Sequence, residues 1–153
     1  MKKHIYVLPN PEKPKAVEAA EGICKMIESF GYDCKISAIP ENAVDAQSMA
    51  DADYLVVLGG DGTILQVARA TADIDAPIVG INYGKLGYMA VLGGDDTDEL
   101  RDILSGKHIV QERMMLDVDI IKGDKSVRSF SRALNEAVIS NGPIPHLVEF
   151  DLY

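Results

Sequence analysis

The chain has 153 residues, which is enough for one typical domain or for one domain and part of another. A hydrophobic fraction of 47% suits a packed core, while a formal net charge of −9 argues against nonspecific binding to nucleic acid or to an anionic membrane. No apolar run reaches the length of a signal-peptide core or of a membrane span. The two cysteines, Cys24 and Cys34, are expected to be reduced thiols of a cytoplasmic protein.

Strand and helix patterns alternate from the start of the chain. The apolar run at residues 3–8 predicts a buried strand, and Pro14 suits the start of a helix that Gly31 should end. The core face of this helix should carry the apolar residues that recur at helical spacing. These are Val17, Ala20, Ile23, Cys24, Ile27 and Phe30. Residues 33–39 alternate like a strand, and residues 41–50 indicate a weak helix or a loop.

The clearest strand pattern lies at residues 54–58, which are all apolar and lead directly into a glycine-rich turn. Residues 64–72 then predict a helix, residues 77–81 a strand, and residues 82–94 a loop rich in glycine. Each expected strand is thus followed by a helix or a loop long enough to cross back over the sheet.

A further helix is expected to begin near Asp96. Asp96 and Glu99 lie three positions apart before an apolar face, which resembles a capping box, and Gly106 should end the helix. The repeated alternation predicts a Rossmann-like α/β domain over residues 1–109, with a parallel sheet, right-handed crossovers and helices on both faces.

The pattern changes after residue 110. Residues 114–122 and 126–140 alternate like strands around a polar turn, and residues 147–153 indicate another strand. We therefore expect the first strands of an incomplete all-β domain over residues 110–153, because two or three strands without a helix rarely form a stable domain. Open strand edges invite association, so we also expect a homo-oligomer.

The strongest chemical signal is the string Gly59-Gly60-Asp61-Gly62-Thr63 after the strand at residues 54–58. Ligands of open parallel sheets bind at this carboxyl edge. The glycines allow close backbone approach and positive φ, and the amides that open the next helix can bind a phosphate. Asp61 can accept a proton from a hydroxyl or help hold a metal–phosphate complex. The plain alternative is a turn in which Asp61 caps the helix, but such a string occurs by chance at about one position in a million.

This string resembles the signature shared by NAD kinases, by diacylglycerol- and sphingosine-type lipid kinases and by phosphofructokinase relatives. Two further segments favour the NAD kinases. Residues 82–88 are similar to that family's Asn-x-Gly-x-Leu-Gly-Phe, and Asn135-Glu136 is similar to its Asn-Glu motif. Tyr88 replaces the usual Phe, and Met89-Ala90 replaces Leu-Thr, which we interpret as packing substitutions. The family's later glycine- and Thr/Ser-rich segment has no counterpart here, so this chain is expected to be inactive alone.

The resemblance implies phosphorylation of the 2′-hydroxyl of the adenosine ribose of NAD to give NADP. ATP or polyphosphate would be the donor, with Mg²⁺ or another divalent cation. Asp61 would be the general base and Gly62 would contact NAD through its backbone. Gly59, Gly60 and Thr63 would shape the phosphate-binding turn. The partners would therefore be small nucleotides, with neither nucleic acid nor a membrane involved.

Three residues of the second region are also implied as ligand contacts. Asn135 and Glu136 would hydrogen-bond NAD, and His146 lies at an offset from them that resembles a ligand-contacting histidine of some bacterial members. Without the resemblance, Asn135-Glu136 would be a solvated strand edge and His146 a surface or packing residue. Arg69 and Lys85 flank the glycine-rich segments and receive no role.

Two other functions stay open. A lipid or sphingoid-base kinase would share the glycine-rich string, but residues 82–87, Asn135-Glu136 and the lack of a basic, apolar membrane-facing surface argue against it. A nucleotide-binding or regulatory module without catalysis is the second alternative, because the chain lacks the later segment of the family.

Overall fold

The computed structural model describes residues 2–84, 87–94, 96–138 and 151. The chain divides into two compact units, Met1–Arg113 and Met114–Tyr153, and each is described here by itself. The change of pattern was expected near residue 110. The first unit contains the glycine-rich string, and the second contains Asn135 and Glu136.

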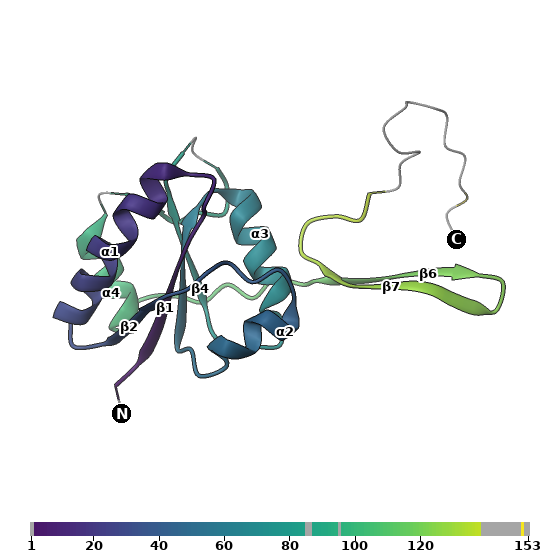
Figure 1. The fold of residues 1–153 in the computed structure, drawn as a ribbon, viewed down its shortest axis with the longest axis horizontal. Coiled ribbons are helices and arrows are strands. Elements are labelled where there is room, and N and C mark those ends of the chain that lie inside the picture. Colours follow the sequence, from purple (N-terminus) through teal and green to yellow (C-terminus); the bar gives the residue numbers. More distant parts are fainter. Residues whose placement is uncertain (1, 85–86, 95, 139–150, 152–153) are drawn as a thin grey trace. The chain divides into compact units, whose positions relative to one another are not determined.

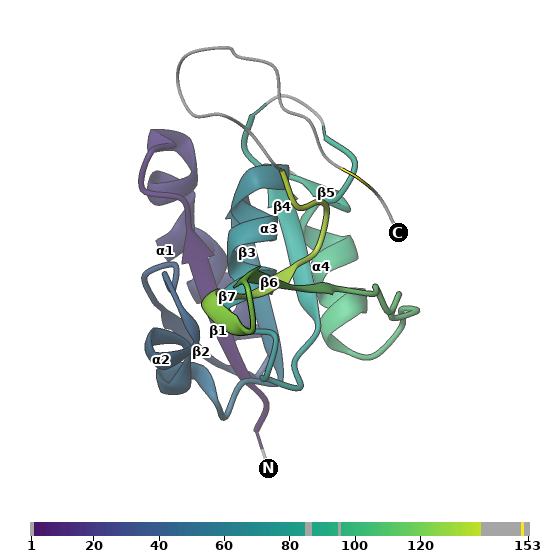
Figure 2. The ribbon, with the colours of Figure 1, turned by 90° about the vertical axis from the view of Figure 1, so that its right-hand side faces the viewer.

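The first unit is built on a five-stranded sheet in the order β2-β1-β3-β4-β5, in which every paired strand is parallel. The strands are β1 (His4–Pro9), β2 (Asp33–Ile36), β3 (Tyr54–Gly59), β4 (Ile78–Asn82) and β5 (Leu92–Gly93). Strand β3 is central, and all six of its residues are buried. In Figure 2 the strands run from the end of the unit that carries the N-terminus to the opposite end.

Helices cover both faces of this sheet, which confirms the expected α/β fold. They are α1 (Pro14–Ser29), α2 (Ala43–Ala46), the short 3-10 helix η1 (Gln47–Met49), α3 (Asp61–Ala70) and α4 (Thr97–Leu104). Figure 1 shows α1 and α4 on one side of the sheet and α2 and α3 on the other.

The two faces of the sheet enclose two separate apolar clusters. Alternate residues of β3 enter different clusters: Val56 packs with α1 and α4, and Val57 packs with α2 and α3. This follows from the two-residue period of a strand, since neighbouring side chains point to opposite faces. Both valines are fully buried, and burial of such a side chain contributes about 1.5–3 kcal/mol. The central strand is therefore fixed from both sides, and so is the turn that follows it.

Most expected boundaries of the first helix are confirmed. Helix α1 begins at Pro14, and Gly31 follows it with φ +91°, a conformation that favours glycine. One core position was wrong: Val17 is 49% exposed, and Ala16 is buried in its place. The buried face of α1 is therefore rotated slightly from the expected one, with its buried residues at Ala16, Ala20, Ile23, Cys24 and Ile27.

Two features of residues 82–96 differ from expectation. A fifth strand, β5, pairs with β4 through Ile81–Leu92 and Asn82–Gly93, within a segment expected to be a loop. The capping box expected at Asp96 is also wrong. The Asp96 carboxylate accepts a hydrogen bond from the Gly93 amide at 2.6 Å and makes no cap to α4. The side chain that would have capped the helix instead closes the turn after β5.

The second unit contains an antiparallel pair, β6 (Leu116–Lys122) and β7 (Lys125–Ala133), which confirms the two strands expected around a polar turn. Gly123 occupies that turn with φ +60°. The strand expected at residues 147–153 lies, apart from Asp151, outside the described residues. The interpretation of this unit as the start of an NAD-binding domain is a proposal.

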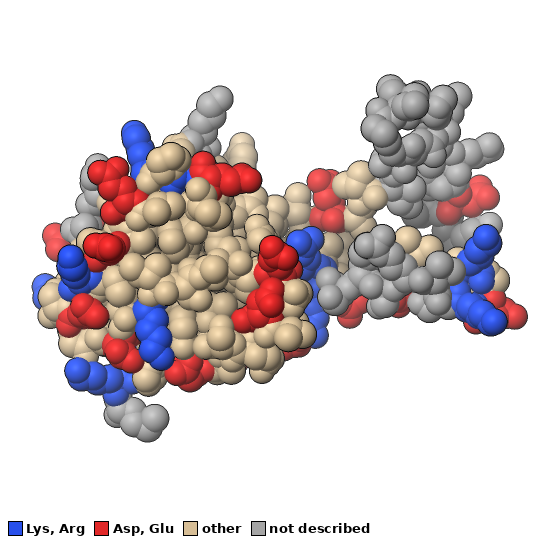
Figure 3. Space-filling model, viewed as in Figure 1, with Lys and Arg blue, Asp and Glu red and all other residues tan. Residues whose placement is uncertain are grey.

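No helix in the described ranges combines the length and the apolar character that crossing a membrane requires. On the face of the first unit drawn in Figure 3, Lys and Arg side chains alternate with Asp and Glu and do not gather in one basic patch. This distribution agrees with the acidic composition of the chain.

Candidate functional site

The glycine-rich string forms the connection between β3 and α3. Gly60 is the N-cap of α3 in an extended conformation, with φ −133° and ψ −172°, and the helix begins at Asp61. The positive φ expected of these glycines is not observed at Gly59, Gly60 or Gly62. Gly59 is required for space instead, because a Cβ there would lie 2.5 Å from Oγ1 of Thr63. The glycine lets the first turn of α3 fold back onto the end of β3.

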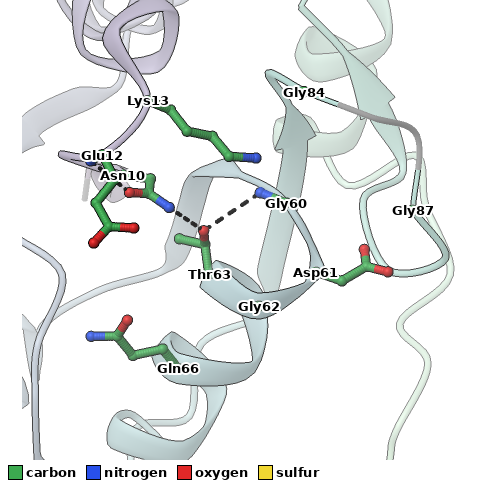
Figure 4. Close-up of a pocket in the computed structure, with 10 residues that line it drawn as sticks. All are labelled: Asn10, Glu12, Lys13, Gly60, Asp61, Gly62, Thr63, Gln66, Gly84 and Gly87. Atoms are coloured by element: carbon green, nitrogen blue, oxygen red, sulfur yellow. Dashed lines mark hydrogen bonds between the residues drawn. The ribbon is translucent and has the colours of Figure 1, made fainter.

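A pocket of about 670 Å³ opens at this carboxyl edge of the sheet (Figure 4). Its walls come from the β1–α1 turn, from the first two turns of α3 and from the loop after β4. The lining residues are Asn10, Glu12, Lys13, Gly60, Asp61, Gly62, Thr63, Gln66, Gly84 and Gly87. Four residues of the glycine-rich string therefore share one cavity with parts of two other connections.

Asp61 does not cap the helix. Its Oδ2 accepts a hydrogen bond from the Tyr88 amide at 2.8 Å, and its Oδ1 accepts one from the Met89 amide at 3.1 Å. These backbone donors, that of Tyr88 first, lower the pKa of Asp61 below its ordinary value of 3.8, and the charge of Lys13 acts in the same direction. Asp61 is therefore a carboxylate at neutral pH and is joined directly to the loop after β4.

Lys13 was not identified from the sequence, yet its side chain extends over the pocket (Figure 4). A Cβ on Gly60 would lie 2.9 Å from its Nζ, and a Cβ on Gly84 would lie 2.8 Å from it. The residue is half-buried, and its ammonium makes no hydrogen bond or ion pair within the described ranges. Nothing in the sequence separates Lys13 from the neighbouring exposed Lys15, so only the fold could single it out.

Asn10 was also missed, although its position in the sequence carries a usable signal. It directly follows β1, and β1 lies beside β3 in the same direction. The ends of adjacent parallel strands meet at one edge, so the turn after β1 must adjoin the glycine-rich string. Figure 4 shows the result: Thr63, which is buried, accepts hydrogen bonds from the Asn10 side chain and the Gly60 amide.

The remaining candidates lie elsewhere. Asn135 and Glu136 belong to the second unit and are exposed just after β7, while His146 and Lys85 lie outside the described residues. Arg69 is in the last turn of α3 and does not line the pocket.

The packing interpretation of the segment after residue 87 holds only in part. Met89 and Ala90 pack against the apolar cluster beneath α3. Tyr88 is fully exposed, so the packing interpretation was wrong for it. Its backbone is held by Asp61 while its ring extends into solvent. The ring is therefore presented at the rim of the site instead of stabilising the core.

Comparison with known proteins identifies the family. Residues 5–111 match the family model of the ATP-NAD kinase N-terminal domain, a range that contains the sheet apart from His4, its helices and every residue that lines the pocket. The chain belongs to the NAD kinase family. The match includes two of the three segments that carried the resemblance, residues 59–63 and 82–88, and ends before Asn135-Glu136.

Individual relatives agree with this assignment. The chain is 31% identical over 156 residues to an NAD kinase of Natranaerobius thermophilus, covering 96% of this chain and 54% of the relative. It is 32% identical over 161 residues to an NAD kinase of Symbiobacterium thermophilum, covering 99% of this chain and 56% of the relative. The chain thus spans about half the length of these relatives.

A solved structure supports the fold. Yeast NADH kinase, crystallised with NADH, matches with a TM-score of 0.66 and 18% identity, covering 88% of this chain and 47% of that chain. At this identity the likeness concerns the fold alone.

Proposed function

We propose that this chain supplies the glycine-rich half of an NAD kinase active site, in which the 2′-hydroxyl of the adenosine ribose of NAD is phosphorylated to give NADP. One observation carries the proposal. The carboxylate of Asp61 and the ammonium of Lys13 line one pocket at the start of α3. Phosphoryl transfer requires a group that orients a hydroxyl and groups that neutralise phosphate charge, and this pocket offers both.

The first turn of α3 is suited to bind the phosphates of the donor. The backbone N–H groups of Asp61 and Gly62 have no acceptor among the described residues, as is usual for the first amides of a helix. The helix dipole adds a partial positive charge at this end, and Lys13 adds a full one. Local attraction of this kind overcomes the repulsion expected from a net charge of −9, which is spread over the whole chain.

Asp61 would act chiefly by orientation. Its lowered pKa keeps it ionised, so it accepts a hydrogen bond from the attacking hydroxyl but is a weak base toward the ground state. As the new bond to phosphorus forms, the terminal P–O bond of the donor breaks and ADP or a shortened polyphosphate leaves. The attacking hydroxyl becomes strongly acidic during this step, and its proton moves to Asp61. Transfer late in the reaction suits a phosphoryl transition state that needs little activation of the nucleophile.

A divalent cation fits this arrangement as part of the donor complex. Mg²⁺ usually keeps several waters and is held by one or two carboxylates together with substrate phosphates. Asp61 and Glu12 are the carboxylates that line the pocket, and Figure 4 draws them on opposite sides of it, so the cation would be held mainly by the donor phosphates and by water. No group of three or more His, Cys, Asp or Glu in the described part of the chain could form a metal site of its own. When bound, the cation would neutralise charge on the phosphates.

The rest of the proposal concerns groups outside the pocket. Asn135, Glu136 and His146 would contact NAD from the second unit, in line with the motif that the chain shares with the family. ATP or polyphosphate would be the donor. The location would be cytoplasmic and the assembly a homo-oligomer formed through strand edges, of which β6 and β7 are the longest in the described chain.

The test combines binding and turnover. The chain labelled with ¹⁵N is titrated with ATP and Mg²⁺, and we expect amide shifts to concentrate at Gly60, Gly62 and Thr63. NADP formation from NAD is assayed on the chain and on any longer product that contains it, with turnover expected only from the longer one. Absence of turnover in an enzyme-length product, or ATP shifts confined to other surfaces, would overturn the proposal.

A further inference from the structure

The loop after β4 lies directly on the catalytic candidate of the first unit. Both carboxylate oxygens of Asp61 accept backbone amides, one from Tyr88 and the other from Met89. These are residues 27 and 28 positions away in the sequence. Two hydrogen bonds from successive amides define the plane of the carboxylate, whereas a single bond would leave it free to rotate.

Gly87 is the residue that makes this approach possible. A Cβ at Gly87 would overlap the carboxyl group of Asp61, with the Cγ and Oδ2 atoms only 2.5 Å away. Gly87 does not adopt positive φ, so glycine is required here because a side chain has no space, and not because of the backbone conformation. Any side chain at this position would push the loop away from Asp61 or rotate the carboxylate out of its place.

We propose that Gly87 is a positioning residue, and that Asp61 has two simultaneous tasks: anchoring the loop that carries Tyr88 and facing the substrate. An ionised carboxylate has about four acceptor positions, and the two loop amides use two of them. Acceptor capacity therefore remains on the carboxylate for a hydroxyl. Because the loop fixes the plane of the carboxylate, it also fixes the directions in which that remaining capacity points.

The anchor itself stands on geometry alone, whereas its catalytic consequence rests on the proposed function. With the loop in place, Tyr88 is held fully exposed beside the carboxylate. With the loop displaced, Asp61 would regain rotational freedom and the rim of the pocket would change shape together with it. The orientation of the Asp61 carboxylate and the position of Tyr88 are therefore coupled.

The test is an NMR titration of the chain between pH 2 and 7 without nucleotide. Amides that donate to a carboxylate move when it is protonated, so Tyr88 and Met89 should share one midpoint, below the ordinary aspartate range. Lys13 is the charged group facing Asp61 among the described residues, and it is left unchanged. In Gly87→Ala the midpoint should rise toward the ordinary value, and the shift amplitude at both amides should fall by at least half.

Two further variants keep the result interpretable. Gly22→Ala is the matched control, because a Cβ at Gly22 meets no atom within 4 Å, and its titration should equal that of the parent chain. Asp61→Asn should abolish the shared acid-range titration at Tyr88 and Met89 even if Gly87→Ala fails to fold. The proposal is overturned if these amides do not follow Asp61, or if a folded Gly87→Ala retains the parent midpoint. Neither result depends on whether NADP is formed, so failure of the proposed function would be seen separately.

Discussion

The side-chain amide of Asn10 donates a hydrogen bond to Oγ1 of Thr63 at 2.7 Å, which joins the turn after β1 to the first turn of α3. Oδ1 of Asn10 in turn accepts the Glu12 amide at 2.8 Å. One asparagine thus sets the shape of the turn that precedes Lys13 and fixes it to the glycine-rich string. The β1–α1 turn and the first turn of α3, which form two walls of the pocket, are thus joined through Thr63.

Removing the Thr63 hydroxyl should loosen this junction. Thr63→Val keeps the shape of the side chain but deprives Asn10 of its acceptor, and an unpaired group of this kind costs about 1–3 kcal/mol. Urea unfolding should show a loss of stability in that range. Thr63→Ser is the matched control, since it retains the hydroxyl. A loss in Thr63→Val no larger than that in Thr63→Ser would mean that the hydrogen bond to Asn10 contributes little to stability.

Replacing Lys13 should weaken binding of the phosphate donor selectively. Lys13→Met removes the ammonium over the pocket but keeps most of the apolar stem. A hydrogen bond to a charged group contributes about 1.5–3 kcal/mol, so the Kd for ATP with Mg²⁺ should rise about ten- to a hundredfold. Calorimetric titration measures it. Lys15→Met serves as the control because Lys15 is exposed and does not line the pocket. Equal weakening by both would indicate a general charge effect.

The Asp61→Asn variant should lower NADP formation by about a hundred- to ten-thousandfold, the usual contribution of a positioned base. Asparagine also disturbs the loop, because its NH₂ group cannot accept the amide of Tyr88 or Met89. The rate should be measured in an enzyme-length product that contains the chain. Near-normal turnover would remove Asp61 from the reaction.

Gly80 should be intolerant of any side chain. A Cβ on this residue of β4 would lie 2.5 Å from Cδ1 of Ile64 and 3.1 Å from the backbone of Ala90. The Ile64 methyl can rotate away, but the backbone must move, so Gly80→Ala should destabilise the first unit by about 1–3 kcal/mol. Gly22→Ala, in an open position of α1, should be neutral or stabilising by up to about 1 kcal/mol. Denaturation midpoints of the two variants would be compared.

The hydroxyl of Tyr6 should give the chain a pH-dependent share of its stability. It donates to Asp51 at 2.7 Å; burial first, and then this bond, raise the pKa of Tyr6 to about 12. The same bond lowers the pKa of Asp51 below 3.8. The contribution is therefore present at neutral pH, falls as the pH drops below 3.8, and falls again as it rises from 10 toward 12.

Tyr6→Phe should accordingly lose about 0.5–1.5 kcal/mol at neutral pH. Its difference from the parent chain should shrink at both extremes of pH, as followed by urea unfolding. Tyr88→Phe is the control, because the Tyr88 ring is fully exposed. A difference that stays constant with pH would mean that the hydroxyl bond does not titrate with Asp51 or Tyr6.

The sheet could be predicted because its strands have strong local patterns. Residues 54–58 are apolar without interruption, which is typical of a strand buried on both faces, and β3 lies there. The location of the pocket followed from the same reasoning, since the glycine-rich string comes directly after that strand. The glycine-rich string is rare enough by chance to be recognised from the sequence alone, without knowledge of the tertiary structure.

The parts that escaped prediction depend on contacts distant in sequence. Strand β5 has only two residues, and one is glycine, so it has no periodicity and exists only because β4 lies beside it. Asp96 had the spacing of a capping residue, but the Gly93 amide competes for its carboxylate. The capture of Asp61 by the loop after β4 is likewise invisible in the local sequence, because it joins positions 27 residues apart.

The pairing of β3 on both sides has a consequence for how the two halves of the pocket respond to a ligand. Amides of a doubly paired, fully buried strand exchange with solvent only when the whole unit unfolds, whereas the amides of Tyr88 and Met89 are bonded to a side chain, the Asp61 carboxylate. Deuterium should therefore enter the amides of Tyr88 and Met89 long before it enters those of β3. The side of the pocket next to β3 is therefore held by the sheet. The side next to Tyr88 and Met89 can shift when a ligand binds, without unfolding of the unit.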